Sequence, residues 1–278
     1  MFWDTHMHTS FSTDSDTPPA VMARKALCLG LDGICFTEHL DYDYPCEPNA
    51  PSARGDGFSD EFLLDAGSYL SSIKALQTQY ANRLPILAGI ELGLQPHLGA
   101  RYEAFLHDYA FDFVIGSSHV VHGMDPYYSC YFDGRTEKEA YTEYFSSILE
   151  NIEAFCDFDV YGHIDYVVRY GPNKNAQYSY KKYADVLDAI LQNLISRGKG
   201  IEINTGGFKF GLGHPNPTED IIKRYRELGG EIITVGSDAH KPEHIAYGFD
   251  RVCAILKDAG FSYYTVFKNR KPNFIKCP

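Results

Sequence analysis

Short apolar runs alternate along this chain with longer stretches in which apolar residues recur at helical spacing. The strand-like runs cover residues 2–8, 33–39, 85–93, 113–119, 160–165, 200–204 and 232–240. The helix-like stretches cover residues 17–30, 61–82, 98–109, 136–155, 180–197, 218–228 and 242–260. Strands that alternate with helices in this way predict βα units and a parallel sheet.

The number of these units favours a closed sheet over an open one. Seven strand–helix units predict an α/β fold of the (β/α)7 type, a TIM-like barrel with fewer units than the usual eight. An open, doubly wound sheet is the structural alternative. No linker, low-complexity run or sequence repeat divides the chain, so we expect residues 1–278 to form a single domain.

Composition and charge indicate which kinds of partner and which cellular compartment to expect. The net charge of −12 at pH 7 argues against nucleic acid as a partner, because phosphate backbones require a basic surface. Seven cysteines without a C-x-x-C pair fit a reducing compartment. The N-terminus has no leader pattern and no apolar run is long enough to span a bilayer, so we expect a cytoplasmic protein without a membrane partner. The oligomeric state stays open, with a homo-oligomer as one outcome.

The first candidate chemistry is the stretch Asp4–His8, which reads Asp-Thr-His-Met-His. Alternate residues of an extended strand share a face, so His6 and His8 would project together. Two neutral imidazoles side by side make a pair of ligands for a divalent metal. This pair is a weak signal on its own, and its weight comes from the other strands.

Ligand-type side chains recur at the same place in the other predicted units. Those at or near the C-terminal ends of predicted strands are His6, His8, His39, Glu91, His119, His163, Asp238 and His240. In a βα barrel these strand ends converge on one face. Carboxylates within apolar runs, such as Glu91, are costly to bury unless they are paired or bind a metal. The pattern therefore predicts a metal cluster, and we interpret four further histidines as ordinary structural residues: His97, His107, His214 and His244.

Six short motifs together resemble those of a known family. They are DTHMHT at Asp4–Thr9, TEH at Thr37–His39, GIELG at Gly89–Gly93, GSSH at Gly116–His119, GHID at Gly162–Asp165 and GSDAH at Gly236–His240. The sequence is thereby identified as similar to the PHP family, whose name joins polymerase and histidinol phosphatase. The resemblance implies a metal-dependent phosphoesterase on a distorted (β/α)7 barrel.

The resemblance also implies how the ligands are shared among two to three divalent ions, with Zn, Fe and Mn as candidates. The first metal would be held by His6, His8, Glu91 and Asp238. Glu91 would bridge to a second metal held by His119 and His163. A third would take His39, His240 and Asp14, with Asp16 as the alternative to Asp14. Asp4 is expected to orient one of the ligating imidazoles.

The implied chemistry is attack on phosphorus by a hydroxide that the metals activate, without a covalent phosphoenzyme. Arg169, six residues past His163, is the expected phosphate-binding and catalytic arginine. Lys209, in a glycine-rich stretch, is a second phosphate-binding candidate, and Arg54 is a weaker third. Asp165 is the candidate proton donor to the leaving oxygen, with His122 or a metal-bound water as alternatives.

Within the family, free-standing chains of this length resemble histidinol-phosphate phosphatases, which serve histidine biosynthesis. The long segment Asp41–Asp60 and the tyrosines Tyr127, Tyr128 and Tyr131 are expected to roof the site and recognise the substrate. Acidic residues there, namely Asp43, Glu47 and Asp125, would pair with the substrate ammonium. The alternatives are a phosphoesterase for another small phosphoester, such as a sugar phosphate or nucleotide, and a non-catalytic metal-binding protein.

Overall fold

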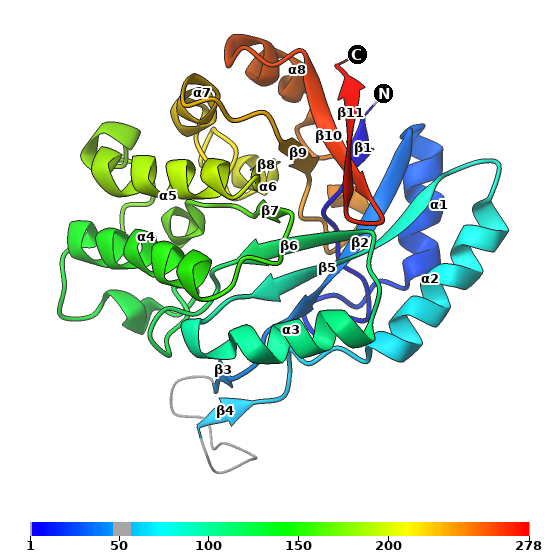
Figure 1. Ribbon diagram of the computed structural model, residues 1–278, viewed down its shortest axis with the longest axis horizontal. Helices are drawn as coiled ribbons and strands as arrows, with labels where there is room; N and C mark the ends of the chain where they lie inside the picture. The colour runs from blue at the N-terminus through cyan, green and yellow to red at the C-terminus, as the bar shows by residue number, and fades with distance from the viewer. Residues whose placement is uncertain (1, 47–56, 278) are drawn as a thin grey trace.

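The computed structural model describes residues 2–46 and 57–277, and its centre is a parallel sheet (Figure 1). The strands are β1 (Trp3–Asp4), β2 (Gly33–Leu40), β5 (Ile86–Gly93), β6 (Phe113–Ser117), β7 (Val160–Tyr161), β8 (Gly200–Asn204) and β9 (Ile233–Gly236). They pair in parallel in the spatial order β1-β2-β5-β6-β7-β8-β9. Every predicted strand is therefore present, and each lies beside its predecessor among these seven.

The two edges of this sheet meet and nearly close it into a barrel. Directly after β1, the N–H of Thr5 donates to the carbonyl of Val235 in β9 at 3.0 Å. Further along, the N–H of Asp238 donates to the carbonyl of His6 at 2.8 Å, and His8 donates to Ala239 at 2.9 Å. These bonds satisfy backbone groups that an open sheet would leave unpaired at its edges. The expected (β/α)7 TIM-like barrel is confirmed over the open, doubly wound alternative.

Helices surround the barrel (Figure 1). They are α1 (Pro19–Leu29), α2 (Ala66–Tyr80), α3 (Gly99–Asp108), α4 (Glu137–Ala154), α5 (Ala184–Ser196), α6 (Gly206–Lys209), α7 (Glu219–Glu227) and α8 (Phe249–Asp258). In α5 the buried residues are Leu187, Ile190, Leu191 and Leu194, the spacing that places one helical stripe against a sheet. Across residues 2–46 and 57–277, none of these helices has the length and apolarity needed to cross a bilayer.

Local signals account for several helix ends. Pro19 occupies the first turn of α1, and the helix ends at Gly30, whose φ of 71° requires the left-handed region. At the start of α4, the hydroxyl of Thr136 accepts from the N–H of Glu139, and the carboxylate of Glu139 accepts from the N–H of Thr136. All three ends lie within two residues of the predicted bounds.

Other boundaries differ from the prediction for identifiable reasons. Helix α2 begins five residues later than expected, because Asp65 caps it by accepting from the N–H of Ser68 at 3.1 Å. The helix expected over 242–260 is divided into a short 3-10 turn, Pro242–His244, and α8, which follows Gly248 at φ 74°. The stretch 205–217, between a predicted strand and a predicted helix, contains the short helix α6.

Two hairpins were not predicted. The strands β3 (Tyr44–Pro45) and β4 (Phe58–Ser59) pair across the base of the segment 41–60. At the C-terminus, β10 (Tyr263–Lys268) pairs with β11 (Lys271–Lys276). The hydroxyl of Tyr264 accepts from the N–H of Trp3 at 3.2 Å, and that of Thr265 accepts from Ile233 at 3.3 Å. This second hairpin therefore packs beside the starts of β1 and β9, the end of the barrel opposite the histidines.

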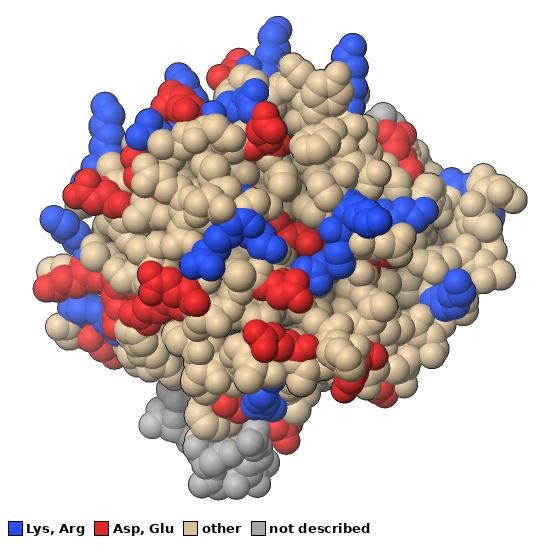
Figure 2. All heavy atoms as spheres, in the orientation of Figure 1, with Lys and Arg blue, Asp and Glu red and all other residues tan. Residues whose placement is uncertain are grey.

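Acidic and basic side chains are interspersed on the face drawn in Figure 2, without a continuous basic surface. This distribution agrees with the net charge of −12.

The cap of α4 can be tested with one substitution made at two places in the same helix. Thr136→Ala removes the capping hydroxyl and should lower the free energy of unfolding by about 1 kcal/mol. Thr142→Ala, at an exposed position where the hydroxyl bonds to the carbonyl of Lys138, should not lower it, because alanine has the higher helix propensity. Urea unfolding followed by circular dichroism measures both, and equal losses would contradict the capping interpretation.

Candidate metal centre and active-site cavity

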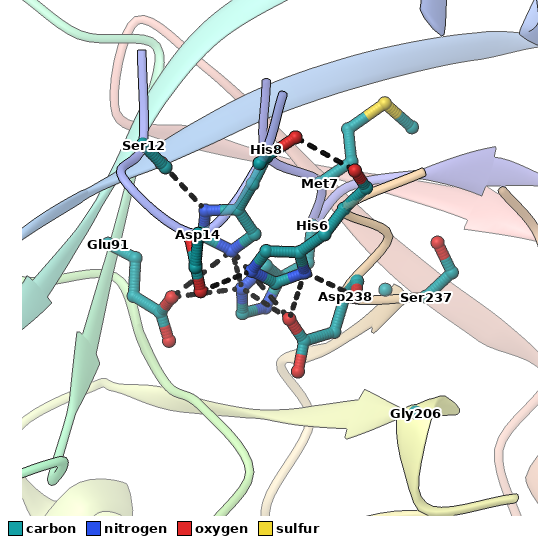
Figure 3. Close-up of polar contacts among 12 residues, drawn as sticks. His6, Met7, His8, Ser12, Asp14, Glu91, Gly206, Ser237 and Asp238 are labelled. Atoms are coloured by element: carbon teal, nitrogen blue, oxygen red, sulfur yellow. Dashed lines mark hydrogen bonds and ion pairs between the residues drawn. The ribbon is translucent and has the colours of Figure 1, made fainter. Parts of the chain in front are cut away.

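Barrel closure brings the N-terminal histidines beside the end of β9. The Nε2 atoms of His6 and His8 lie 3.1 Å apart. Oδ1 of Asp238 lies 3.9 Å from Nε2 of His6 and 3.7 Å from that of His8. Figure 3 shows these three side chains and Glu91 pointing toward one another, the two histidines from the segment after β1, Asp238 from the segment after β9 and Glu91 from β5. His6, His8 and Asp238 form a group whose ligand atoms all lie within 4.8 Å of one another.

Glu91 stands at the centre of the predicted ligands and is fully buried. Its Oε2 lies 3.1 Å from Nε2 of His6 and 3.4 Å from that of His8. Its Oε1 lies 2.8 Å from Nε2 of His163 and 3.3 Å from that of His119. Burial alone would raise the pKa of Glu91, but the surrounding imidazoles outweigh it and hold the pKa well below its usual range. Glu91 therefore contacts the histidines of the first predicted metal site, His6 and His8, and those of the second, His119 and His163.

The third predicted set also gathers in space. The rings of His39 and His240 stack on the ring of His8, with centroids 4.1 and 4.2 Å away, and the ligand atoms of these three residues form a group. Oδ2 of Asp14 lies 2.9 Å from Nε2 of His240 and 3.5 Å from that of His39. Asp16 is exposed and belongs to none of the groups found among the described residues.

Asp41 was missed as a candidate ligand. Its Oδ1 accepts from Nδ1 of His119 at 2.7 Å, and it forms a group with His39 and His119. Gly93 makes room for it, because a Cβ at that position would lie 1.5 Å from Oδ1 of Asp41. The signal was present in the sequence, since Asp41 directly follows Leu40, the last residue of β2.

Glu202 is a second residue that sequence reasoning missed. Its Oε1 accepts from Nδ1 of His6 at 2.7 Å, and its Oε2 accepts from the N–H of His163 at 3.2 Å. A Cβ at Gly236 would lie 2.3 Å from Cβ of His6 and 2.5 Å from Oε1 of Glu202, so the glycine permits this contact. The signal was a carboxylate inside the apolar run GIEIN, the same pattern that singled out Glu91.

The hydroxyl of Ser12 fixes the orientation of His8. It donates to Glu38 at 2.6 Å and accepts from the N–H of His39 at 3.0 Å. A hydroxyl has one donor and two acceptor sites, so its contact with Nδ1 of His8 at 3.2 Å is one that Ser12 accepts. The proton of His8 therefore sits on Nδ1, and Nε2 turns its lone pair toward the cluster.

Asp4 does not hold an imidazole, contrary to the prediction. Its carboxylate accepts from the N–H and hydroxyl of Ser237 at 2.9 and 2.5 Å, and from the N–H of Ala246 at 2.9 Å. Burial raises the pKa of Asp4 to about 6. Asp4 instead ties β1 to the segment after β9, and among the described residues no hydrogen bond or ion pair joins its carboxylate to an imidazole.

The geometry of these residues fits divalent metal ions. Glu202 and Ser12 each accept from an Nδ1–H, so the Nε2 lone pairs of His6 and His8 face each other at 3.1 Å. Two lone pairs this close repel unless a cation lies between them, and ligand nitrogens on one tetrahedral zinc stand about 3.3 Å apart. Imidazoles combined with carboxylates suit Zn, Fe and Mn alike.

A cavity of about 610 Å³ opens over the cluster. Six residues of the ligand groups line it: His39, Asp41, His119, His163, Asp238 and His240. Aromatic side chains line it as well: Tyr44, Phe62, Tyr127, Tyr128, Tyr166, Tyr170 and Phe210. Tyr131, expected in the roof, is instead fully buried in the core.

The cavity also contains two of the three predicted phosphate-binding side chains. Arg169 lines it, and its Nη1 donates to Oδ2 of Asp238 at 2.9 Å. Lys209 lines it too, and its Nζ donates to the carbonyl of Asp238 at 3.0 Å. Burial lowers the pKa of Lys209 from its ordinary value. Arg54 falls outside the described residues.

The two side chains considered as proton donors lie elsewhere. Asp165 is fully buried, accepts from Nδ2 of Asn216 at 2.5 Å and from the N–H of Thr218 at 3.1 Å, and is absent from the described residues that line the cavity. His122 is half exposed and contacts Glu143 and Glu150 at 3.0 and 3.1 Å. These placements do not support Asp165 or His122 as the donor, because neither faces the cavity.

The four histidines interpreted as structural occupy different surroundings. His97 pairs with Asp43 on the surface, His107 is exposed beside Asp108, and Nδ1 of His214 contacts the carbonyl of Pro215 at 2.6 Å. His244, by contrast, lines the cavity, which its sequence position in a predicted helix gave no reason to expect.

Comparison with known proteins identifies the family. A family model, the PHP domain, matches residues 4–206. The chain belongs to the PHP family. The match ends before Asp238 and His240, which barrel closure places against the N-terminal motif of this PHP protein.

Relatives of the PHP chain align over nearly its whole length. It is 29% identical over 272 residues to a histidinol-phosphatase of Lactococcus lactis, covering 96% of this chain and 95% of that protein. It is 31% identical over 254 residues to a probable histidinol-phosphatase of Clostridium acetobutylicum, covering 90% of each.

Two solved structures resemble this one. A crystal structure of histidinol phosphate phosphatase from Lactococcus lactis, complexed with Zn, L-histidinol and phosphate, has a TM-score of 0.88 at 30% identity and covers 98% of each chain. A putative histidinol phosphatase from Listeria monocytogenes shares the fold, with a TM-score of 0.76 at 21% identity, covering 90% of this chain and 100% of the other.

The contact between Glu202 and His6 can be tested by metal affinity. Glu202→Gln keeps the shape but replaces the charged acceptor of His6 Nδ1–H, and should weaken metal binding roughly ten- to a hundredfold. Competition with a chromophoric chelator measures this affinity. Glu153→Gln, at an exposed position of α4, is the matched control and should leave it unchanged. Equal affinities for the two variants would contradict an orienting role for Glu202.

Proposed function

We propose that this protein is a phosphoric monoester hydrolase that converts L-histidinol phosphate to L-histidinol and phosphate, a step of histidine biosynthesis. The observation that carries the proposal is the arrangement of charge in the cavity. Arg169 and Lys209 line the cavity and contact Asp238, a proposed metal ligand, whereas the buried carboxylate of Asp125, which also lines it, bonds to a tyrosine hydroxyl and a backbone N–H. A substrate with a phosphate at one end and an ammonium at the other complements such a cavity.

Two to three divalent ions are proposed as cofactors. Their ligands would be His6, His8, Asp14, His39, Glu91, His119, His163, Asp238 and His240, with Asp41 added from the structure. Zinc is a candidate because it is bound in the Lactococcus lactis enzyme, and Fe and Mn suit the same ligands. Bound ions supply Lewis acidity and a water of lowered pKa for attack on phosphorus.

Arg169 and Lys209 would bind the oxygens of the phosphate. Arg169 is buried, and a buried guanidinium binds an oxyanion more strongly than an exposed one because water competes less. Its bond to Oδ2 of Asp238 leaves Oδ1 directed at His6 and His8, so the same arginine also orients a proposed ligand. Phosphate bound there would lie against the metal cluster.

Asp125 would bind the ammonium of the substrate. The partners that the described residues supply to its carboxylate are neutral: the hydroxyl of Tyr44 at 2.6 Å, the N–H of Tyr127 at 2.7 Å and the hydroxyl of Tyr166 at 3.4 Å. Burial raises the pKa of Asp125, so a cationic ligand beside it would stabilise the ionised form. Of the other two acidic candidates, Asp43 pairs with His97 and Arg101 on the outside, and Glu47 falls outside the described residues.

Phosphate release from L-histidinol phosphate tests the proposed function directly. Purified protein reconstituted with Zn, Mn or Fe should prefer this substrate over sugar phosphates, nucleotides and an aryl phosphate, and a chelator should abolish turnover. Glu91→Ala should remove both bound metal and activity. Turnover of other esters alone would favour the alternative substrates, and bound metal without any turnover would favour a non-catalytic metal-binding protein.

Substitution of Asp125 tests the ammonium contact. Asp125→Asn removes one charge-assisted bond and should lower kcat/KM for L-histidinol phosphate about tenfold or more, mainly through KM. Its kcat/KM for an aryl phosphate without an ammonium should stay near that of the wild type. Asp43→Asn, the same substitution at a half-buried carboxylate that is not among the residues lining the cavity, should change neither, and a loss shared by both substrates would reject the contact.

A further inference from the structure

The guanidinium of Arg169 is held on three sides. Its Nε donates to Oδ1 of Asn216, its Nη1 to Oδ2 of Asp238 and its Nη2 to Oδ1 of Asn204, each at 2.9 Å. A guanidinium has five N–H donors, so these bonds leave one on each terminal nitrogen for a ligand. Because the side chain is only 3% exposed but lines the cavity, it has little freedom to reorient toward a ligand.

Two asparagines can hold Arg169 only if their amides point the right way. An amide presents an oxygen acceptor on one side and an NH2 donor on the other. A flipped Asn216 would direct its NH2 at Nε–H of Arg169, so that two donors would face each other. The orientation of these amides therefore decides whether the guanidinium is held or repelled.

A carboxylate stands behind each asparagine and fixes its orientation. Nδ2 of Asn216 donates to Oδ1 of Asp165 at 2.5 Å, and Nδ2 of Asn204 donates to Oε2 of Glu202 at 3.1 Å. An ionised carboxylate only accepts, so it binds the NH2 side of the amide and turns the oxygen toward Arg169. The backbones of the two asparagines also bond to each other, N–H to carbonyl in both directions at 2.8 Å.

We propose that Asp165 is a positioning residue for phosphate binding, which acts through Asn216 to hold Arg169 in the orientation that presents its two remaining N–H groups to the phosphate. This inference rests on the proposed phosphatase function, because it takes a phosphate as the ligand of Arg169. It gives Asp165 a role although the side chain does not line the cavity. It also accounts for a buried carboxylate that would otherwise be costly to desolvate.

A purely structural role for Asp165 predicts something different. Its Oδ2 accepts from the N–H of Thr218 at 3.1 Å, directly before α7, so it also stabilises the start of that helix. Loss of this bond alone would lower stability without a specific effect on phosphate. The test must therefore separate phosphate affinity from the melting temperature.

The first variant is Asp165→Asn. Whichever way its amide turns, the NH2 faces either Nδ2 of Asn216 or the N–H of Thr218, so one donor meets another. Affinity of the metal-loaded protein for inorganic phosphate, measured by titration calorimetry, should fall about tenfold or more. Metal content and melting temperature are measured on the same samples.

The second variant reverses the pair. In the double variant Asp165→Asn with Asn216→Asp, the new amide donates to the new carboxylate, and that carboxylate accepts from Nε of Arg169. The net charge is unchanged, and phosphate affinity should return to near that of the wild type. Asn216→Asp alone places two carboxylates together and should be as defective as Asp165→Asn.

A third comparison removes Arg169. In an Arg169→Ala background, adding Asp165→Asn should cost no further phosphate affinity, because the residue through which Asp165 acts is gone. Three results would each overturn the inference. They are wild-type phosphate affinity in Asp165→Asn, a double variant whose phosphate affinity stays low, and an equal loss of phosphate affinity on adding Asp165→Asn to Arg169→Ala. Wild-type protein that binds phosphate but does not hydrolyse L-histidinol phosphate would instead reject the proposed function, and the phosphate series would still decide the role of Asp165.

Discussion

The structure depends on burying many polar groups in one small volume at the end of a barrel. Glu91 and Asp238 are buried carboxylates, and the imidazoles around them turn ring nitrogens inward. Such groups are costly to remove from water unless opposite charges or a metal compensate them. The close approach of His6 and His8, with both Nδ1 atoms already engaged, makes a cation the natural complement of this arrangement. The rest of the fold positions these groups.

Hydrogen bonds to neighbouring side chains orient three of the proposed histidine ligands. Glu202, Asp41 and Ser12 bond to the Nδ1 atoms of three histidines and leave their Nε2 atoms directed inward. Gly93 and Gly236 leave room for two of these carboxylates, because a side chain at Gly93 would overlap Asp41 and one at Gly236 would overlap Glu202. Ligands held in this way lose little conformational entropy when a metal binds, which favours a preorganised site.

Charge is divided within the cavity in a way that suits a zwitterionic phosphoester. Arg169 and Lys209 contact Asp238 and belong to the metal side, whereas Asp125 is bonded to tyrosine hydroxyls and a backbone N–H. A protein with a net charge of −12 would repel an anionic substrate at long range, so the cations and metals of the site must offset that field locally. The paired carboxylates and asparagines behind Arg169 keep one of these cations in place.

The sequence by itself determined the order of strands and helices, the parallel sheet and the identity of most groups in the site. Apolar periodicity reveals the elements, and histidines or carboxylates at the ends of apolar runs reveal ligand types, because both patterns are local. Asp41 and Glu202 followed the same pattern and were detectable in principle. The C-terminal hairpin, by contrast, depends on contacts with Trp3 and Ile233 that are remote in sequence.

Only the tertiary structure decided what each side chain does. The local pattern placed Asp4 and Asp165 near the site. It could not show that Asp4 bonds to Ser237 or that Asp165 bonds to Asn216. Nor could it show that Asp125 faces the cavity while Asp43 lies outside. The physical reason is that residue type and spacing fix which hydrogen bonds a side chain is able to make. Barrel closure and the packing of loops choose the partner.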